Sequence, residues 1–241
     1  MLTTAFTVDS DHDHPMTGGG LAHREPQDAL AERLAAGVAH TLEAREHLFC
    51  EGDQATHVYR VEVGHICIYR MMPDGRRQVV DFAYPGDVIG LGALGEHADS
   101  AQAMERTVVR GLPVATLKDL ARFDSQLGIK LYEALSRELL AARELLFTVS
   151  QRTAAERVAA FLMALSRRNE RRGEKPDEIV LPMTRMDIAD FLGLTIETVS
   201  RTFTRLRTDG VIDLEQCILV TIRNPGALQA LAEGGPESRA R

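Results

Sequence analysis

Residues 184–212 read TRMDIADFLGLTIETVSRTFTRLRTDGVI, and this stretch decides the fold of the C-terminal part of the chain. Thr184 is followed three residues later by Asp187, in the pattern of a capping box, and Thr195 is placed to cap a second helix. Gly193, between the two, supplies the sharp bend of a helix-turn-helix. The stretch therefore predicts two helices, over Thr184 to Leu192 and over Thr195 to Arg207.

The second predicted helix has an apolar stripe and a polar face. Glu197 and Arg201 lie one turn apart near its N-terminal end, the part that enters the major groove in helix-turn-helix proteins. A carboxylate accepts from cytosine N4, and an arginine binds guanine O6 and N7. An exposed ion pair between these two side chains is the alternative explanation. The two caps and the glycine bend favour DNA recognition, with Glu197, Ser200, Arg201, Thr184, Thr195, Thr198 and Arg205 as candidate DNA-binding residues.

Charge is divided unevenly along the 241 residues, whose formal net charge is −7. From Arg152 onward there are 14 basic and 13 acidic residues, and before it 14 basic and 22 acidic. A nearly balanced C-terminal part is compatible with DNA, whereas the acidic N-terminal part is not. The difference indicates two domains with different partners.

Several classes of protein are excluded by what the sequence lacks. No run of about 18 apolar residues or signal peptide is present, so we expect a cytoplasmic protein with no membrane span. The three cysteines are far apart, which argues against a disulfide framework, a metal centre or an iron–sulfur cluster. No catalytic set such as Ser/His/Asp, a P-loop or HExxH is visible, so we expect no enzyme and no cofactor. Cys217, in a predicted hairpin, is either a redox-active thiol or a small packing residue.

The N-terminal half changes from a polar tail, residues 1–25, to short β-rich runs. A helix is expected from about Gln27 to Thr41. The runs that follow, divided by turn signals, predict an antiparallel roll or barrel. They are HVYRVEVG, HICIYRMM, RRQVVDFAY, VIGL, RTVVRGL and VATL.

A long helix from about Ser125 to Ser150 connects the two halves. Its broad apolar face must be covered either by its own roll or by a second copy of the helix, as in a parallel coiled coil. Glu138 makes the heptad imperfect. The candidate dimerisation residues are Leu131, Leu135, Ala142, Leu145 and Val149.

Three stretches resemble the CRP/FNR family of bacterial transcription regulators: GLTIETVSR, DGRRQVVDFAYPGDVIG and AERVAAFLMALSRR. The resemblance covers about Leu42 to Ala232. It implies an α+β fold in which an N-terminal β-roll, similar to cyclic-nucleotide-binding domains, is joined by a long dimerisation helix to a C-terminal winged helix-turn-helix. The expected division is a mobile tail over 1–25, the roll with its preceding helix over 26–124, the dimerisation helix over 125–151, the DNA-binding domain over 152–232 and a tail over 233–241.

The chain is most similar to the FixK-like branch of this family. The resemblance implies a homodimer that binds double-stranded DNA and RNA polymerase and mainly activates genes of microaerobic respiration and nitrogen fixation. Glu197, Ser200 and Arg201 match the recognition residues of FNR-like members, which implies a TTGAT-N4-ATCAA palindrome. Members of the CRP type carry an arginine immediately before the glutamate, where this chain has Ile196.

The sequence departs from the family at the phosphate cassette of its cyclic-nucleotide-binding members. Leu91 follows Gly90 where they carry a glutamate, and Asp99 precedes Ser100 where they carry the arginine that binds the phosphate. A carboxylate repels a phosphate, so we expect no cyclic-nucleotide binding. The alternative is a regulator of the same fold gated by haem, a metabolite or a nucleotide, with His65 and His97 available to a haem. A third possibility is an enzyme or ligand-binding module without a DNA function.

Overall fold

The computed structural model describes residues 33–93, 95–216 and 218–234. Its N-terminal part is a roll of two four-stranded antiparallel sheets, with strand orders β1-β8-β3-β6 and β2-β7-β4-β5. The apolar residues between the sheets include Val61, Ile66 and Val109, all fully buried. The strands are β1 (Val38–Leu42), β2 (His47–Phe49), β3 (His57–Val63), β4 (Ile66–Met71), β5 (Arg77–Ala83), β6 (Val88–Ile89), β7 (Ser100–Ala103) and β8 (Thr107–Pro113).

Two predictions for the edges of the roll are wrong. The expected helix over 27–41 ends before Val38, because residues 38–42 pair with β8 as strand β1. Gly37 allows this approach, since a Cβ there would clash with the Gly111 carbonyl. Residues 27–32 of that helix are outside the described ranges. The run VATL is the first turn of helix α2 (Val114–Phe123), since β8 ends at Pro113 and Leu117 then packs inward.

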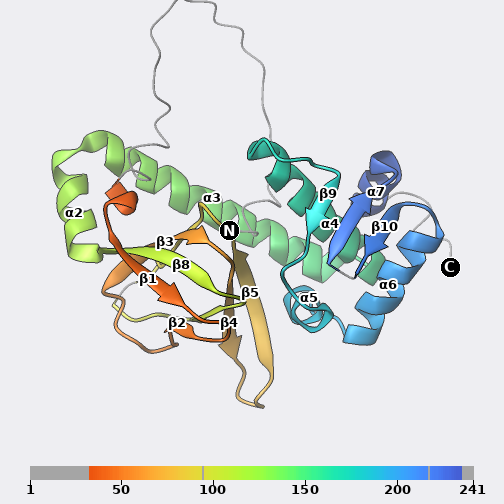
Figure 1. The fold of residues 1–241 in the computed structure, drawn as a ribbon, viewed down its shortest axis with the longest axis horizontal. Helices are drawn as coiled ribbons and strands as arrows, with labels where there is room; N and C mark the ends of the chain where they lie inside the picture. The colour runs from red at the N-terminus through yellow and green to blue at the C-terminus, as the bar shows by residue number, and fades with distance from the viewer. Residues whose placement is uncertain (1–32, 94, 217, 235–241) are drawn as a thin grey trace, which may run out of the picture.

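Helix α3 (Ser125–Gln151) confirms the predicted long helix. Asp124 caps it, since its side chain accepts from the backbone N–H groups of Gln126 and Leu127. The helix runs from α2 along one side of the roll and on to the C-terminal elements (Figure 1). None of the helices within the described ranges combines the length and apolar composition that crossing a membrane needs.

The C-terminal part is a winged helix-turn-helix. Its three-stranded sheet has the order β10-β11-β9. Helices α5 and α6 form the helix-turn-helix, and the β10–β11 hairpin forms the wing (Figure 1). The elements are α4 (Ala154–Arg171), β9 (Glu178–Val180), α5 (Arg185–Leu192), α6 (Ile196–Thr208), β10 (Ile212–Glu215), β11 (Leu219–Ile222) and α7 (Pro225–Ala232).

An apolar seam joins the roll to the helix-turn-helix. Phe191 of α5 is 2% exposed, and its ring lies 5.5 Å from that of Phe82 on β5 and 6.0 Å from that of Phe161 on α4. Residues of both parts consequently form one continuous buried cluster. The helix-turn-helix is therefore packed against the roll and is not connected to it through α3 alone.

Replacing Phe191 by alanine should lower the free energy of unfolding by about 3–5 kcal/mol, because a fully buried ring between two others is lost. Urea denaturation of the purified chain, followed by circular dichroism, measures the change. Phe123→Ala is the matched control, since that ring is 91% exposed and its loss should change stability by no more than about 0.5 kcal/mol. Equal effects of the two substitutions would contradict the seam.

Candidate nucleic-acid interface

The turn between α5 and α6 is fixed by one glycine conformation and two hydrogen bonds. Gly193 adopts the left-handed conformation, with φ 63° and ψ 42°, which favours glycine. The Leu194 N–H donates to the Ala189 carbonyl at 2.9 Å. Arg157 of α4 donates to the Leu192 carbonyl at 3.0 Å, so the C-terminal end of α5 is bound to a neighbouring helix. These contacts set the direction in which α6 leaves α5.

Both predicted helix caps are present. The Thr184 side chain accepts from the Asp187 N–H, and the Asp187 carboxylate accepts from the Thr184 N–H, which completes the capping box. Thr195 caps α6 by accepting from the Thr198 N–H at 3.2 Å. Both helices thus start where the threonine signals predict.

Helix α6 buries one face and presents the other to solvent. Val199, Phe203 and Leu206 are buried in the core. The guanidinium of Arg185 on α5 lies 3.8 Å from the centre of the Phe203 ring, which adds a cation–π contact between the two helices. The α6 residues on the outer side are Glu197, Ser200, Arg201, Thr204 and Arg205, all exposed, with Thr198 half-buried.

The exposed face keeps its charged groups available. Among the ion pairs of the described residues none joins Glu197 to Arg201; Arg201 Nε donates instead to the Glu197 backbone carbonyl at 3.4 Å. Arg205 contacts Asp209 at 3.5 Å, but its side chain stays 65% exposed. Of the seven candidate DNA-binding residues, Thr184 and Thr195 lie at helix starts and the other five lie on α6.

A basic residue, Arg223, directly follows β11 of the wing. Arg223 donates to Asp213 at 3.1 Å, and this hydrogen bond lowers the pKa of the Asp213 carboxyl. Cys217, the candidate redox residue, lies outside the described residues. Of the other cysteines Cys50 is exposed and Cys67 buried, and burial raises the pKa of the Cys67 thiol to about 12, which makes it unreactive.

The predicted dimerisation residues lie on different sides of α3. Leu131 is half-buried against the roll and Leu145 against the helix-turn-helix core. Leu135 is 43% exposed and Ala142 is exposed, and the side chain of Val149 is outside what is described. An exposed stripe at spacings of three and four is instead formed by Tyr132, Leu135, Leu139, Ala142 and Leu146.

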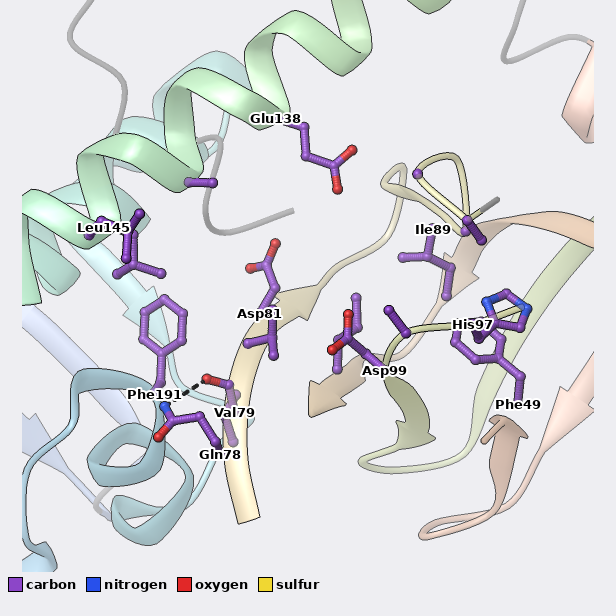
Figure 2. Close-up of a pocket in the computed structure, with 18 of the residues that line it drawn as sticks. Phe49, Gln78, Val79, Asp81, Ile89, His97, Asp99, Glu138, Leu145 and Phe191 are labelled. Carbon is purple, nitrogen blue, oxygen red and sulfur yellow. Dashed lines mark hydrogen bonds between the residues drawn. The ribbon is translucent and has the colours of Figure 1, made fainter. Parts of the chain in front are cut away.

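A cavity of about 710 Å³ lies between β5, the loop after β6 and α3 (Figure 2). Apolar side chains make up most of its wall, but three carboxylates, those of Asp81, Asp99 and Glu138, also line it. His97 lies against Phe49 with the ring centres 3.6 Å apart. No lysine or arginine is among the described residues that line the cavity.

The ionisation of these groups follows their burial. Burial raises the pKa of Asp99, opposed by Arg70, which contacts its carboxylate at 3.0 Å. Burial, and then the charge of Asp81, raise the pKa of Glu138. Burial lowers the pKa of His97, so its ring is kept neutral.

The cavity does not suit a cyclic nucleotide. Asp99, which pairs with Arg70, places a carboxylate in the wall of the cavity, and Leu91 packs into an apolar cluster of the roll. The other candidate haem ligand, His65, is bound to Glu105 at 2.6 Å. No group of three metal-ligating side chains occurs in the described part of the chain.

Comparisons with known proteins match both parts of the chain. Residues 156–231 match the Crp-like helix-turn-helix domain, and residues 39–123 the cyclic nucleotide-binding domain. The chain is 40% identical over 187 residues to the nitrogen fixation regulation protein FixK of Bradyrhizobium diazoefficiens, covering 78% of each chain. It is 37% identical over 215 residues to the transcriptional activator protein Anr of Pseudomonas protegens, covering 88% of this chain and 87% of Anr.

The solved structure of FixK2 from Bradyrhizobium japonicum has the same fold, with a TM-score of 0.76 and 35% identity over 81% of this chain and 97% of that one. The fold and the exposed face of α6 define a DNA-binding transcription regulator and not an enzyme. The chain belongs to the CRP/FNR family and is of the FixK, FNR and Anr type. The predicted family and fold class are thereby confirmed.

Cyclic AMP and cyclic GMP should leave the melting temperature of the purified chain unchanged, because the described wall of the cavity offers carboxylates and no arginine to a phosphate. A ligand that binds the folded state raises the melting temperature, so thermal melts with either nucleotide in large excess test this directly. A dose-dependent rise would contradict the expectation. Asp99→Arg restores the positive charge that nucleotide-binding relatives carry at this position. With either nucleotide, the melting temperature of this variant should therefore rise more than that of the wild-type protein.

Proposed function

We propose that this protein is a homodimeric regulator, mainly an activator, that binds an FNR-like TTGAT-N4-ATCAA palindrome. In this proposal residues 26–124 form a sensor-like roll, 125–151 the dimerisation helix and 152–232 the DNA-binding domain, and residues 1–25 and 233–241 are tails. The observation that carries the proposal is the face of α6, where Glu197, Ser200 and Arg201 are exposed together near a capped N-terminus. In the cytoplasm the dimer would bind DNA and contact RNA polymerase.

The assignment of base contacts follows from side-chain chemistry. Arg201 is suited to the guanine of TTGAT, and Glu197 to a cytosine N4 in the opposite strand. Ile196 has no donor for a further guanine, which favours the FNR-like over the CRP-like half-site. Thr184, Thr195, Thr198 and Arg205 surround this face and are suited to phosphate contacts, which set the register of the helix without reading bases.

The homodimer is supported by the exposed stripe on α3, defined by Tyr132, Leu135, Leu139, Ala142 and Leu146. Its spacing is that of a heptad seam, and leaving so many large apolar groups in water is unfavourable. Of the five candidate dimerisation residues predicted from the sequence, Leu135, Ala142 and Val149 share this heptad register. Leu131 and Leu145 fall outside it, as does Glu138, which faces the cavity (Figure 2).

A ligand-gated regulator of the same fold is the second candidate, because the cavity touches both the roll and α3, and Phe191 of the helix-turn-helix lines it. A ligand there would contact both parts of the chain. Haem is disfavoured, since His97 is stacked and buried and His65 is bound to Glu105. We favour DNA binding that needs no effector. The operator experiment below separates this function from the ligand-gated one, because a regulator that requires a ligand would not bind the operator as purified protein alone.

Arg201→Ala should weaken binding to the FNR-like operator by about 1–3 kcal/mol per half-site and relax the preference for guanine at the contacted position. Gel shifts at fixed salt, with effector-free protein, compare the TTGAT-N4-ATCAA operator with a guanine-to-adenine operator and with a CRP-type operator. Arg122→Ala, on α2 and far from α6, removes the same charge and should leave the preferences unchanged. Equal wild-type affinity for the FNR-type and CRP-type operators would contradict the proposed function.

Leu139→Glu should convert the dimer to monomer. Two leucines per dimer, each worth about 1.5–3 kcal/mol when buried, are lost, so the dimer dissociation constant should rise about 100-fold or more. Sedimentation equilibrium measures this constant. Phe123→Glu changes an apolar residue outside the stripe that is even more exposed than Leu139, 91% against 54%, and should have no effect. A Leu139→Glu protein that sediments as a dimer at the wild-type concentration would rule out this seam.

A further inference from the structure

We propose that Arg77 of β5 is a positioning residue for DNA recognition, which holds α5 through Asp187 and Asp190 and thereby sets the separation of the two α6 helices. The inference rests on the proposed dimeric DNA binding and adds the element that fixes its geometry. Arg77 is 110 positions away from Asp187 in the sequence and belongs to the roll, not to the DNA-binding domain.

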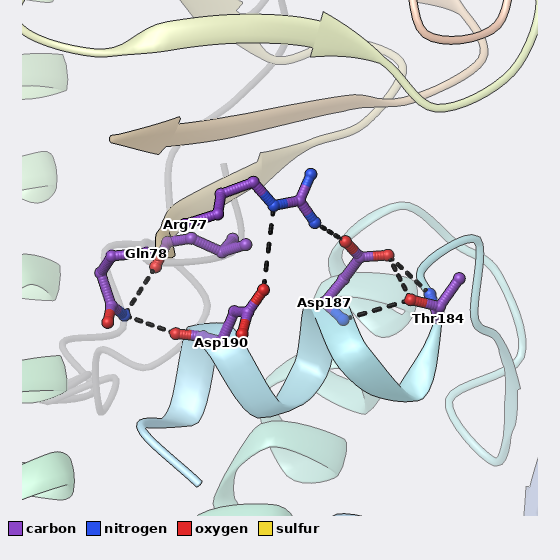
Figure 3. A network of polar contacts seen from close by, with 6 residues as sticks. Arg77, Gln78, Thr184, Asp187 and Asp190 are labelled. Carbon is purple, nitrogen blue, oxygen red and sulfur yellow. Dashed lines mark hydrogen bonds and ion pairs between the residues drawn. The ribbon is translucent and has the colours of Figure 1, made fainter. Parts of the chain in front are cut away.

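The polar contacts of Arg77 connect the roll to the DNA-binding domain. Its guanidinium donates to the Asp187 carboxylate on one side, and its Nε lies 3.8 Å from the Asp190 carboxylate on the other (Figure 3). The adjacent Gln78 side chain donates to the Asp190 backbone carbonyl. Two neighbouring residues of β5 thus bind side chains and backbone over one turn of α5.

The Arg77 side chain is itself held in place. Its guanidinium lies 5.2 Å from the centre of the Tyr69 ring on β4, and the Tyr69 hydroxyl is hydrogen-bonded to His47 on β2 at 2.8 Å. Only 27% of the Arg77 side chain and 12% of the Asp187 side chain are exposed. The pair is therefore less screened by solvent than an ordinary surface ion pair.

Asp187 uses its two oxygens for two different purposes. Oδ1 accepts from Arg77, while Oδ2 accepts from the Thr184 N–H at 2.9 Å and from the Thr184 hydroxyl at 2.6 Å. The roll therefore binds the same carboxylate that caps α5. The Gly193 turn joins α5 directly to α6, so a shift of α5 at Asp187 also moves the DNA-contacting helix.

A second polar contact also restrains the orientation. Arg168 on α4 donates to Asp87 on the loop of the roll at 3.1 Å, with its guanidinium 4.0 Å from the centre of the Tyr84 ring. The apolar seam around Phe191 is non-directional and would allow the domain to rotate or slide. Two ionic contacts on different helices, Arg77 with Asp187 on α5 and Asp87 with Arg168 on α4, oppose such movement.

The consequence for DNA is a preference for one spacing of half-sites. A dimer whose recognition helices are held at fixed separation matches half-sites about one DNA turn apart and discriminates against other spacings. A domain that pivots can reach operators of altered spacing. Arg77 should therefore affect spacing discrimination while leaving the recognition of bases to Glu197 and Arg201.

The experiment measures binding of full-length protein to operators with spacers of four, three and five base pairs, at fixed salt. Arg77→Ala should reduce the discrimination between spacers about tenfold, an effect between those of exposed and buried ion pairs. Asp187→Asn, which keeps an oxygen for Thr184 but removes the charge, should act in the same direction. Arg77→Lys should restore part of the discrimination.

Arg76→Ala is the matched control, because this neighbouring arginine pairs with Asp74 within its own turn and is 79% exposed. It should retain wild-type discrimination. Discrimination against the guanine-to-adenine operator should be the same in all variants, which separates positioning from loss of folding. If Arg77→Ala and Asp187→Asn keep the wild-type discrimination between spacers, the inference about Arg77 is wrong and the proposed function still stands. If the wild-type protein binds none of the operators, the proposed function is wrong as well.

Discussion

The packing of Phe191 between Phe82 and Phe161 is the contact on which the arrangement of this molecule depends. It makes one apolar core out of residues of β5, α4 and α5, so the helix-turn-helix is placed relative to the roll and not only relative to its own hinge. The seam brings β5 next to α5, where Arg77 and Gln78 of β5 make their polar contacts with α5. Without it, α3 and α4 would be the main connection between the two parts.

The parts of the structure that could be predicted from sequence are those determined by local interactions. Thr184, Gly193 and Thr195 act within four residues of themselves, and each lies where its pattern predicts. The edges of the roll were mispredicted because long-range pairing decides them. Residues 38–41 fit a helical pattern in isolation, yet they pair with β8, whose partner residues are about 70 positions later.

The candidate site shows the same division. The α6 face could be predicted because its polar and buried residues alternate with the helical period. The side of α3 that the roll covers could not, since nothing within the helix distinguishes Leu131 from Tyr132. The contact between Arg77 and Asp187 gave no signal either, because charge pairs between distant segments leave no local pattern. The helical period and the caps thus predict the DNA-contacting face, and tertiary contacts decide how that face is oriented relative to the roll.

Helix α3 serves two surfaces at once, since Leu131, Glu138 and Leu145 face the chain's own domains and the stripe from Tyr132 to Leu146 lies one position further along. One residue of helix corresponds to a rotation of about 100°. Inserting a single residue before Glu138 would therefore turn the residues that face the chain's own domains into the position of the stripe beyond that point, and the Glu138 carboxylate would enter the apolar stripe. Inserting a whole heptad would restore the rotation, but it would lengthen α3 by about 10 Å and pull Phe191 away from Phe82, so the seam fixes the length of α3 as well as its rotation.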